Sequence, residues 1–540
     1  MQKPFATTLD PGSSLTNHTG TWRTSRPVYV NRLPPCNHAC NAGENIQGWL
    51  YYAEAGDYRT AWETLTLDNP MPAIMGRICY HPCESSCNRG QLDVAVSIHS
   101  VERFLGDEAI RQGWKFDMPQ FRGKNVLVVG SGPSGLSAAY HLRRLGHRVT
   151  ICDAQAAAGG MMRYAIPRYR LPRNVLDAEI ARILDTGITL RLKTRIDDPV
   201  AEMQAGGYDA VYLAVGAQIA QRAYIPAGDT KRILDALELL RSTEGSEPVH
   251  IGRRVLIYGG GNTALDAART AKRLGASEAI VVYRRTRERM PAHDFEVREA
   301  EEEGIQFRWL STIKKEENAT FTVEKMQLDE KGFPQPTGEF ETIEADALVL
   351  ALGQNVDQEF LSHIDGLQVE KGSAVVDAHM MTGVPGVFAG GDMVPSERSA
   401  TASIGHGKKA ARNIDAWLRG TEYTPAEKHP LATFDRLNTW YYADAPKTVQ
   451  PVLDQARRQS TFNEVVGGLD ADNALFEARR CLSCGNCFDC NNCYGMCPDN
   501  AVIKPANGEG FRINYEYCKG CGMCAAECPC GAIDMVPELV

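Results

Sequence analysis

The sequence predicts an α/β protein whose two ends are rich in cysteine. Between about residues 120 and 425, apolar strand-like runs alternate with amphipathic helical runs, as in parallel sheets covered by helices. Two glycine-rich turns each lie between such a strand and such a helix. Of the 17 cysteines, five lie between residues 36 and 87 and eleven between residues 481 and 530, so only Cys152 falls inside the α/β region.

The length and the net charge narrow the possible classes of protein. A chain of 540 residues has room for three or four domains, at about 100–200 residues each. The net charge of -9, without a Lys/Arg stripe, argues against a nucleic-acid partner, and the acidic run at 299–304 is expected to be a solvated helix face. We find neither a membrane-spanning apolar run nor a signal peptide, so we expect a cytoplasmic protein whose cysteines bind metal or carry redox chemistry.

The first glycine-rich turn lies in "KNVLVVGSGPSGLSAAYHLRRLGHRVTICD". Gly130 permits the tight turn, Gly132 lets the backbone approach a pyrophosphate, and Gly135 allows close packing of helix on strand. The phosphates would sit at the N-terminus of the helix, whose unpaired N–H groups favour anions. Asp153 ends the next strand and can bond a ribose hydroxyl. We therefore expect a dinucleotide on Gly130, Gly132, Pro133, Ser134, Gly135 and Asp153.

The second copy is "RRVLIYGGGNTALDAARTAKRLGASEAIVVYRR". Its turn consists of Gly259, Gly260 and Gly261, and its helix begins with Asn262 and Thr263. The following strand ends in Arg284 and Arg285, where a fold that selects NAD usually carries an acid. Arginines there can pair with a 2′-phosphate and favour NADP. The alternative is that both arginines are ordinary surface charges.

Two nucleotide folds in one chain suggest a flavoprotein reductase that binds FAD. The strings "ADALVLALGQNVD", with Gly353, and "VPGVFAGGDMV", with Gly391 and Asp392, support this interpretation. An acid in the position of Asp392 can bond the ribityl chain of the flavin. The helix that starts near Ala400 can then face the isoalloxazine.

These strings, with "GRICYHPCESSC" and "AAGGMMRYAIPRYRLP", carry a family resemblance. Residues 31–425 resemble the small subunit of glutamate synthase, the flavin half of dihydropyrimidine dehydrogenase and the large subunit of a ferredoxin:NADP oxidoreductase. The resemblance implies FAD, NAD(P)H and iron–sulfur clusters in an N-terminal helical domain. It adds Gly160 to the cofactor-binding residues, places Asp153 and Asp392 on FAD, and leaves the choice between NADH and NADPH open.

The C-terminal cysteines follow the spacing C-x2-C-x2-C-x3-C-P twice, and residues 487–540 resemble a bacterial two-cluster ferredoxin. In such a protein three thiolates of one run and the last cysteine of the other hold each cluster. A zinc site would not need the distant Cys-Pro. We expect a fragment from about residue 485 to hold about eight irons. The ligand sets are Cys487, Cys490, Cys493 and Cys528, and Cys518, Cys521, Cys524 and Cys497.

The resemblance also implies two [4Fe–4S] clusters in the N-terminal domain, held by eight ligands of which one is a Gln or Glu. It assigns the first cluster to Cys40, Cys79, Cys83 and Glu102; the alternative for Glu102 is a surface helix carboxylate. The second cluster then has only Cys36 and Cys87, because the family's "RCxxCG" string is missing upstream of Cys36.

A near copy of that missing string, "RRCLSCGNC", stands at residues 479–487. Its Cys481 and Cys484 are surplus to the ferredoxin motif. We therefore hypothesise a cluster shared by Cys36, Cys87, Cys481 and Cys484, since the entropic penalty of closing so long a loop grows only with the logarithm of its length. The alternative is that Cys481 and Cys484 are free thiols.

The expected organisation has seven segments. They are an arm (1–30), a helical iron–sulfur domain (31–115), the FAD-binding domain in two parts (116–250 and 376–425), the NAD(P)-binding domain (251–375), a linker (426–480) and a ferredoxin-like domain (481–540).

The expected function is electron transfer between NAD(P)H and ferredoxin-type clusters through FAD, in either direction. The partner would be other subunits of a complex, for example a 2-oxoacid:ferredoxin oxidoreductase, or free ferredoxin. Two alternatives stay open: an electron-transfer subunit without nucleotide turnover, and a self-contained NAD(P)H:acceptor reductase.

Overall fold

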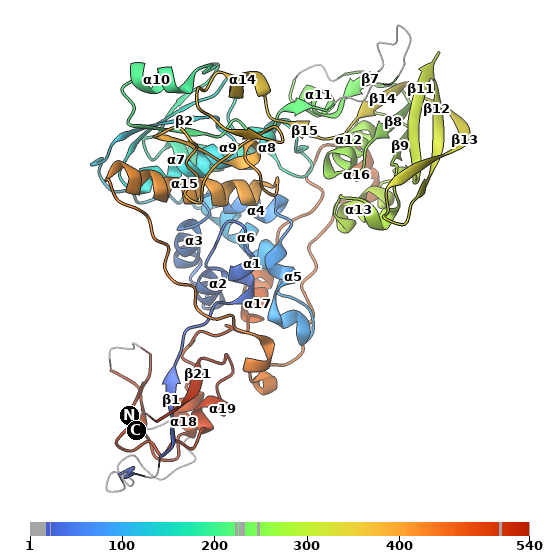
Figure 1. Cartoon of the computed structure of the whole chain (residues 1–540). Coiled ribbons are helices and arrows are strands. Elements are labelled where there is room, and N and C mark those ends of the chain that lie inside the picture. The colour runs from blue at the N-terminus through green and yellow to red at the C-terminus, as the bar shows by residue number, and fades with distance from the viewer. Residues whose placement is uncertain are drawn as a thin grey trace.

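The computed structural model describes residues 18–21, 23–221, 225, 233–245, 249–506 and 510–538. Figure 1 shows two α/β domains side by side at one end, a helical domain below them, and a small ferredoxin-like domain at the far end. The α/β fold class is confirmed. None of the helices in these described ranges is long and apolar enough to cross a membrane.

The first α/β domain holds a five-stranded parallel sheet in the order β18-β5-β2-β3-β4. Helix α7 (Pro133–Arg144) follows β2 and packs against α15 (Ala400–Leu418). Gly407 allows this close packing, because a Cβ there would lie 2.4 Å from the carbonyl oxygen of Ser134. The strands are β2 (Asn125–Val129), β3 (Arg148–Cys152), β4 (Thr189–Arg191), β5 (Ala210–Leu213) and β18 (Val387–Ala389).

The second α/β domain has the parallel order β10-β9-β8-β14-β7, beside an antiparallel sheet of β11, β12 and β13. Its helix α12 (Asn262–Arg273) follows β8. Two short strands, β6 (Ile219–Ala220) and β15 (Gln354–Asn355), pair where the chain crosses between the domains. The other strands are β7 (Ile233–Asp235), β8 (Arg254–Tyr258), β9 (Glu278–Val282), β10 (Gln306–Arg308), β11 (Ser311–Glu317), β12 (Thr320–Leu328), β13 (Pro334–Glu344) and β14 (Ala347–Leu350).

The pairing corrects the edges that we predicted for the NAD(P)-binding domain. β7 lies before residue 251 but pairs with β14, so it belongs to the second sheet. At the other edge, Val356, Phe360 and Leu361 lie before residue 376 but pack into the core of the first domain. Sequence patterns gave no signal for these edges because both short crossing strands contain only two residues each.

The acidic run at 299–304 is a solvated face only in part: Glu301 and Glu302 are exposed, as predicted, but the prediction was wrong for Glu303. Glu303 is fully buried and accepts ion pairs of 2.7 Å each from Arg269 and Arg273. Arg458 of α16 (Gln455–Ser460) adds a third contact at 3.3 Å. The predicted linker is therefore fastened to the second α/β domain through this buried carboxylate.

The helical domain takes one of its helices from that linker. Helix α17 (Ala471–Arg479) packs between α2 and α6. Its buried Glu477 accepts hydrogen bonds from the backbone N–H groups of Ser97 (2.9 Å) and Thr448 (2.5 Å). The chain thus returns to its own N-terminal part before the last cysteines. The domain's other helices are α1 (Pro35–Ala39), α2 (Ile46–Glu54), α3 (Tyr58–Thr66), α4 (Pro72–Ile78), α5 (Pro82–Ser85) and α6 (Ile98–Arg111).

The ferredoxin-like domain takes a strand from the other end of the chain. β1 (Ser25–Tyr29) pairs antiparallel with β21 (Ile533–Pro537) (Figure 1). The last residues of the predicted arm therefore belong to this domain; residues 1–17 of that arm lie outside the described residues. The domain also contains α18 (Asn492–Met496), α19 (Met523–Ala526), β19 (Val502–Ile503) and β20 (Arg512–Ile513).

The remaining elements lie within or between these units. They are α8 (Met161–Tyr164), α9 (Arg173–Leu184), α10 (Pro199–Ala205), α11 (Ala236–Ser242), α13 (Asp294–Glu302), α14 (Gln358–Ser362), β16 (Val369–Glu370) and β17 (Ser373–Ala374).

Candidate functional site

A cavity of about 440 Å³ lies where the two α/β domains and the helical domain meet. Most of the predicted FAD residues line it, and from the second domain so do the first residues of α12. The predicted residues in its wall are Gly130, Gly132, Pro133, Ser134, Asp153, Gly160, Gly391, Asp392, Asn262 and Thr263.

The first glycine-rich turn forms an open cradle in this wall. Gly132 has an ordinary φ of -71°, and the nearest atom to a Cβ built on it would be the Cα of Gly160, 3.9 Å away. The space above Gly132 is therefore free for a pyrophosphate. Gly135 does not line this cavity, and a Cβ on it would lie 1.9 Å from the carbonyl oxygen of Gly130. It serves helix packing, the role the motif gives it.

Two carboxylates face the same cavity. Asp153 accepts hydrogen bonds from the backbone N–H of Ser131 (2.7 Å) and from its hydroxyl (2.5 Å), which fix the carboxylate at the end of β3. Burial raises the pKa of Asp392, to which the hydroxyl of Ser403 donates at 3.4 Å. Helix α15 begins at Ala400, beside Asp392 in the wall. This donor set fits a bound FAD.

The second glycine-rich turn differs from the first in the atoms that would contact a Cβ added at each glycine. A Cβ on Gly259 would lie 2.1 Å from the carbonyl oxygen of Ala351, and one on Gly260 would lie 2.4 Å from the ring of Tyr283. A Cβ on Gly261 would meet nothing within 4 Å, so the space in front of α12 is open. Gly353 has no part in the wall; its carbonyl accepts from Gln221 N (2.9 Å) where the domains cross.

The two predicted coenzyme arginines follow β9 at its carboxyl end. Arg284 is exposed, whereas Arg285 is half-buried with its guanidinium 6.0 Å from the ring centroid of Phe333. The Nε atom of Arg285 is buried and has no hydrogen-bond partner among the described residues. An unpaired buried donor of this kind fits an anionic ligand.

The first predicted N-terminal cluster site is gathered in one cavity. Cys40, Cys79, Cys83 and Glu102 all line it. Glu102 is only 6% exposed, so the alternative of a surface carboxylate is wrong. Burial raises the pKa of Glu102 well above its usual range, as does the neighbouring Glu44.

Glu44 also lines this cavity, although no motif in the sequence singles it out. The side-chain amide of Asn69 donates to both carboxylates, at 2.8 Å to Glu102 and 3.0 Å to Glu44. Asn69 therefore bridges the two carboxylates through its side-chain amide.

The four surplus cysteines also share one cavity. Cys36, Cys87, Cys481 and Cys484 line it together, and the side-chain amide of Asn88 donates to the sulfur of Cys484 at 3.4 Å. Burial raises the pKa of Cys36 well above its usual range, and the three neighbouring thiols raise it further. Four buried thiols can ionise together only beside compensating cations, so their chemistry fits an iron–sulfur cluster.

The ferredoxin-like domain brings its cysteines together across the two runs. Cys497 lines one cavity with Cys518, Cys521 and Cys524. Burial raises the pKa of Cys490, and so does the nearby thiol of Cys528.

Cys487 and Cys493 complete that second group. Burial raises the pKa of both, and the nearby thiol of Cys528 raises each further. Cys530, which the spacing did not single out, is buried with its sulfur 3.7 Å from that of Cys528.

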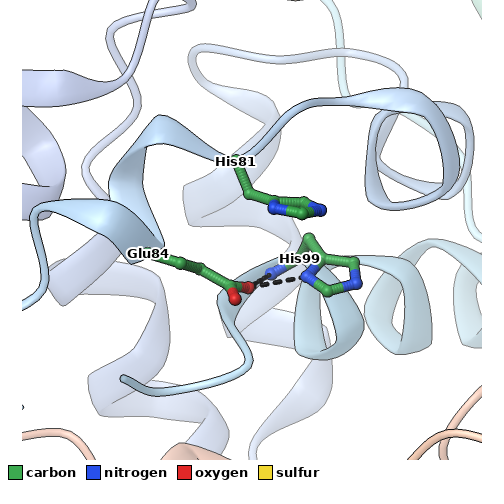
Figure 2. Close-up of side chains that lie close together, drawn as sticks. All are labelled: His81, Glu84 and His99. Carbon is green, nitrogen blue, oxygen red and sulfur yellow. Dashed lines mark hydrogen bonds and ion pairs between the residues drawn. The ribbon is translucent and has the colours of Figure 1, made fainter. Parts of the chain in front are cut away.

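A further group of possible metal ligands proves to be a structural clamp. Figure 2 shows His81, Glu84 and His99 together, with Glu84 accepting from the Nδ1 of His99 at 2.6 Å. The other carboxylate oxygen accepts from Lys447 at 2.8 Å, and the His81 ring stacks on that of His99 at 4.1 Å. Glu84 is thus paired with Lys447 of the linker, and this ion pair holds the linker against the segment that carries Cys79 and Cys83.

The profiles of three known families match this chain. The pyridine nucleotide-disulphide oxidoreductase profile matches residues 124–407, that of dihydropyrimidine dehydrogenase domain II with a 4Fe-4S cluster matches 14–114, and that of the 4Fe-4S binding domain matches 511–534. Together with the geometry, these matches define an NAD(P)H-dependent iron–sulfur flavoprotein oxidoreductase.

Three relatives are similar along most of their length. The chain is 34% identical to the NADP(+)-dependent formate dehydrogenase subunit beta of Moorella thermoacetica, over 83% of this chain and 70% of the relative. It is 31% identical to the NADPH-Fe(3+) oxidoreductase subunit beta of Geobacter sulfurreducens (85% and 77%) and 30% identical to the glutamate synthase [NADPH] small chain of Escherichia coli K12 (71% and 89%). The chain belongs to the pyridine nucleotide-disulphide oxidoreductase family.

Proposed function

We propose that this chain passes electrons between NADPH and a partner protein through FAD and four [4Fe–4S] clusters. The observation that carries the proposal is that the flavin cavity and the first cluster cavity are lined by consecutive residues at two places, and that the two N-terminal cluster cavities share Ile98. FAD supplies the exchange between the two electrons of a hydride and the single electrons that clusters accept. The protein supplies the positions of these groups.

The flavin cavity and the first cluster cavity are lined by consecutive residues of the chain at two places. Ile78 lines the flavin cavity, and the next residue, Cys79, lines the cluster cavity. In the same way Ala400 of α15 lines the flavin cavity and Thr401 lines the cluster cavity. Two separate elements therefore bring both sites within one residue of each other.

The two N-terminal cluster cavities also adjoin each other. Ile98 lines both N-terminal cluster cavities. The hydroxyl of Tyr442 donates to the carbonyl of Leu482 at 3.1 Å, and the backbone N–H of Gly485 donates to the carbonyl of Cys530 at 2.6 Å. The second of these bonds ties the residue after Cys484 to Cys530 of the ferredoxin-like domain.

Preference for NADPH over NADH is supported by two observations. Arg285 offers a buried Nε that has no hydrogen-bond partner among the described residues, and the space in front of α12 is open. Relatives named for NADP(+) and NADPH are similar over most of the chain.

We further propose that the chain is the NAD(P)-reactive subunit of a complex. Relatives of this chain are named as a beta subunit and a small chain. Cys521, exposed in the ferredoxin-like domain, marks the surface on which a partner would exchange electrons. A 2-oxoacid:ferredoxin oxidoreductase is one such partner, on the resemblance of residues 487–540 alone.

The test is anaerobic addition of NADPH to the purified holoprotein. We expect the flavin absorption near about 450 nm to bleach, followed by EPR signals of reduced clusters. An electron-transfer subunit without nucleotide turnover would show no bleaching. A self-contained reductase would reduce free ferredoxin at full rate without added subunits.

A further inference from the structure

We propose that Tyr80 is a positioning residue that couples nucleotide binding at the second glycine-rich turn to the first N-terminal cluster. The inference rests on the proposed function and goes beyond it, because it makes the occupancy of one site change the properties of the other.

In the chain, Tyr80 is the neighbour of a predicted cluster ligand. It lies in the short loop between α4 and α5, directly after Cys79 and three residues before Cys83. Any shift of its backbone is therefore transmitted to a predicted cluster ligand through one peptide bond. Its side chain nevertheless points the other way and lines the large cavity of the two α/β domains.

The side chain of Tyr80 contacts the second glycine-rich turn, where we expect the nicotinamide nucleotide to bind. The side-chain amide of Asn262 donates to the Tyr80 hydroxyl at 2.6 Å. The orientation of this amide is fixed, because its oxygen accepts the backbone N–H of His293 at 3.1 Å and so leaves only the NH2 group for Tyr80. The ring of His293 stacks on that of Tyr80, with centroids 3.7 Å apart and planes 23° apart.

Asn262 is the residue that a bound nucleotide would reach first. It begins α12 directly after Gly261, whose front is open, and no side chain of the described residues caps this helix. The free N–H groups of the first turn and the dipole of the helix favour a phosphate there. A phosphate seated on this turn therefore lies beside the amide that holds Tyr80.

Electrostatic interactions give a second route by which the two sites can affect each other. Arg170 lines the same cavity and pairs with Asp266 of α12 at 2.8 Å and with Glu296 of α13 at 2.6 Å. The charges of all three groups act on Tyr80, so a change at the start of α12 alters the field at the loop of Cys79. Reduction of the cluster adds a negative charge on the other side of that loop. Coupling of this kind is reciprocal, so reduction must change nucleotide affinity by the same factor.

The experiment is an EPR-monitored redox titration of the full-length holoprotein, with and without saturating NADP+. We expect NADP+ to shift the midpoint potential of one N-terminal cluster in the natural protein. Tyr80→Phe keeps the ring but loses the acceptor for Asn262, so it is expected to retain FAD and iron and to lose the shift. As a matched control, Tyr58→Phe removes a hydroxyl bonded to the carbonyl of Ala471 (3.3 Å) in the same domain and is expected to keep the shift.

A second variant covers the case in which Tyr80→Phe loses iron. Asn262→Ser, measured at saturating NADP+, removes the same bond from the opposite side and is also expected to abolish the shift. A shift that persists in either variant with its full iron, or that is missing in the natural protein, overturns the coupling. Bleaching of the flavin by NADPH is recorded on the same samples: bleaching without a shift rejects the coupling alone, whereas no bleaching rejects the proposed function.

Discussion

The nucleotide sites and the cluster sites of this molecule are built in opposite ways. Each glycine-rich turn, with its strand and helix, comes from one continuous stretch of about thirty residues. The shared cluster site and the ferredoxin-like domain join the two ends of the chain: Asn88 and Cys484, 396 positions apart, are in hydrogen-bond contact, and β1 pairs with β21. A nucleotide site can therefore be removed by one local substitution, whereas these cluster sites depend on both ends at once.

The largest effect is expected from Gly132→Val. The φ of -71° accepts any residue, so the turn can still form, but the valine side chain would fill the space that a pyrophosphate needs. We expect a folded protein without flavin and without NADPH oxidation, measured by absorption spectra and activity.

Gly261→Val is the matched variant at the other turn. Its Cβ also meets nothing within 4 Å, so the fold should again tolerate the change. We expect it to keep its flavin and to lose reduction by NADPH. Equal flavin content in the two variants would contradict the division of roles between the turns.

The next largest effect is expected from removing residues 1–30. This truncation deletes β1, whose Tyr29 hydroxyl lies 3.2 Å from the sulfur of Cys493. We expect loss of up to about eight irons, because both ferredoxin clusters depend on this sheet, with FAD retained. For the same reason a fragment from residue 485 lacks a strand and should hold fewer irons than its cysteines predict. Removal of residues 1–17 alone is the control, and iron equal to that of the full chain in both truncations would contradict the account.

This difference in construction explains what could be predicted from the sequence. The strands and helices around both turns were predicted correctly because their signals are local: glycine spacing, apolar periodicity and a strand-ending acid. The contribution of residues 25–29 to the ferredoxin sheet was missed because five polar and apolar residues in a Pro-containing stretch carry no mark of a partner more than 500 positions away. Glu303 was misjudged because its partners Arg269, Arg273 and Arg458 lie on other elements. Tyr80 was not singled out, because its hydrogen bond to Asn262 crosses a domain boundary and leaves no mark in the local sequence.

The smallest effect concerns coenzyme choice. Replacing Arg284 and Arg285 by alanine should raise the KM for NADPH about ten- to a hundredfold for each arginine that bonds the phosphate, since one charge-assisted bond contributes about 1.5–3 kcal/mol. The KM for NADH should change little, because NADH lacks the 2′-phosphate. Arg298→Ala is the control: its ion pair with Asp294 is exposed in the same domain. An equal change for both coenzymes, or none, would reject the phosphate role.

The most direct test of the account is the iron content of the double variant Cys481→Ala, Cys484→Ala. If the two chain ends share a cluster, this protein loses about four irons, while FAD and the EPR signals of both ferredoxin clusters remain. Cys152→Ala removes a buried cysteine that lies away from all the cluster cavities, at the end of β3, and should keep its full iron. An unchanged iron content in the double variant, or the loss of a ferredoxin signal in place of the shared cluster, would contradict the shared site.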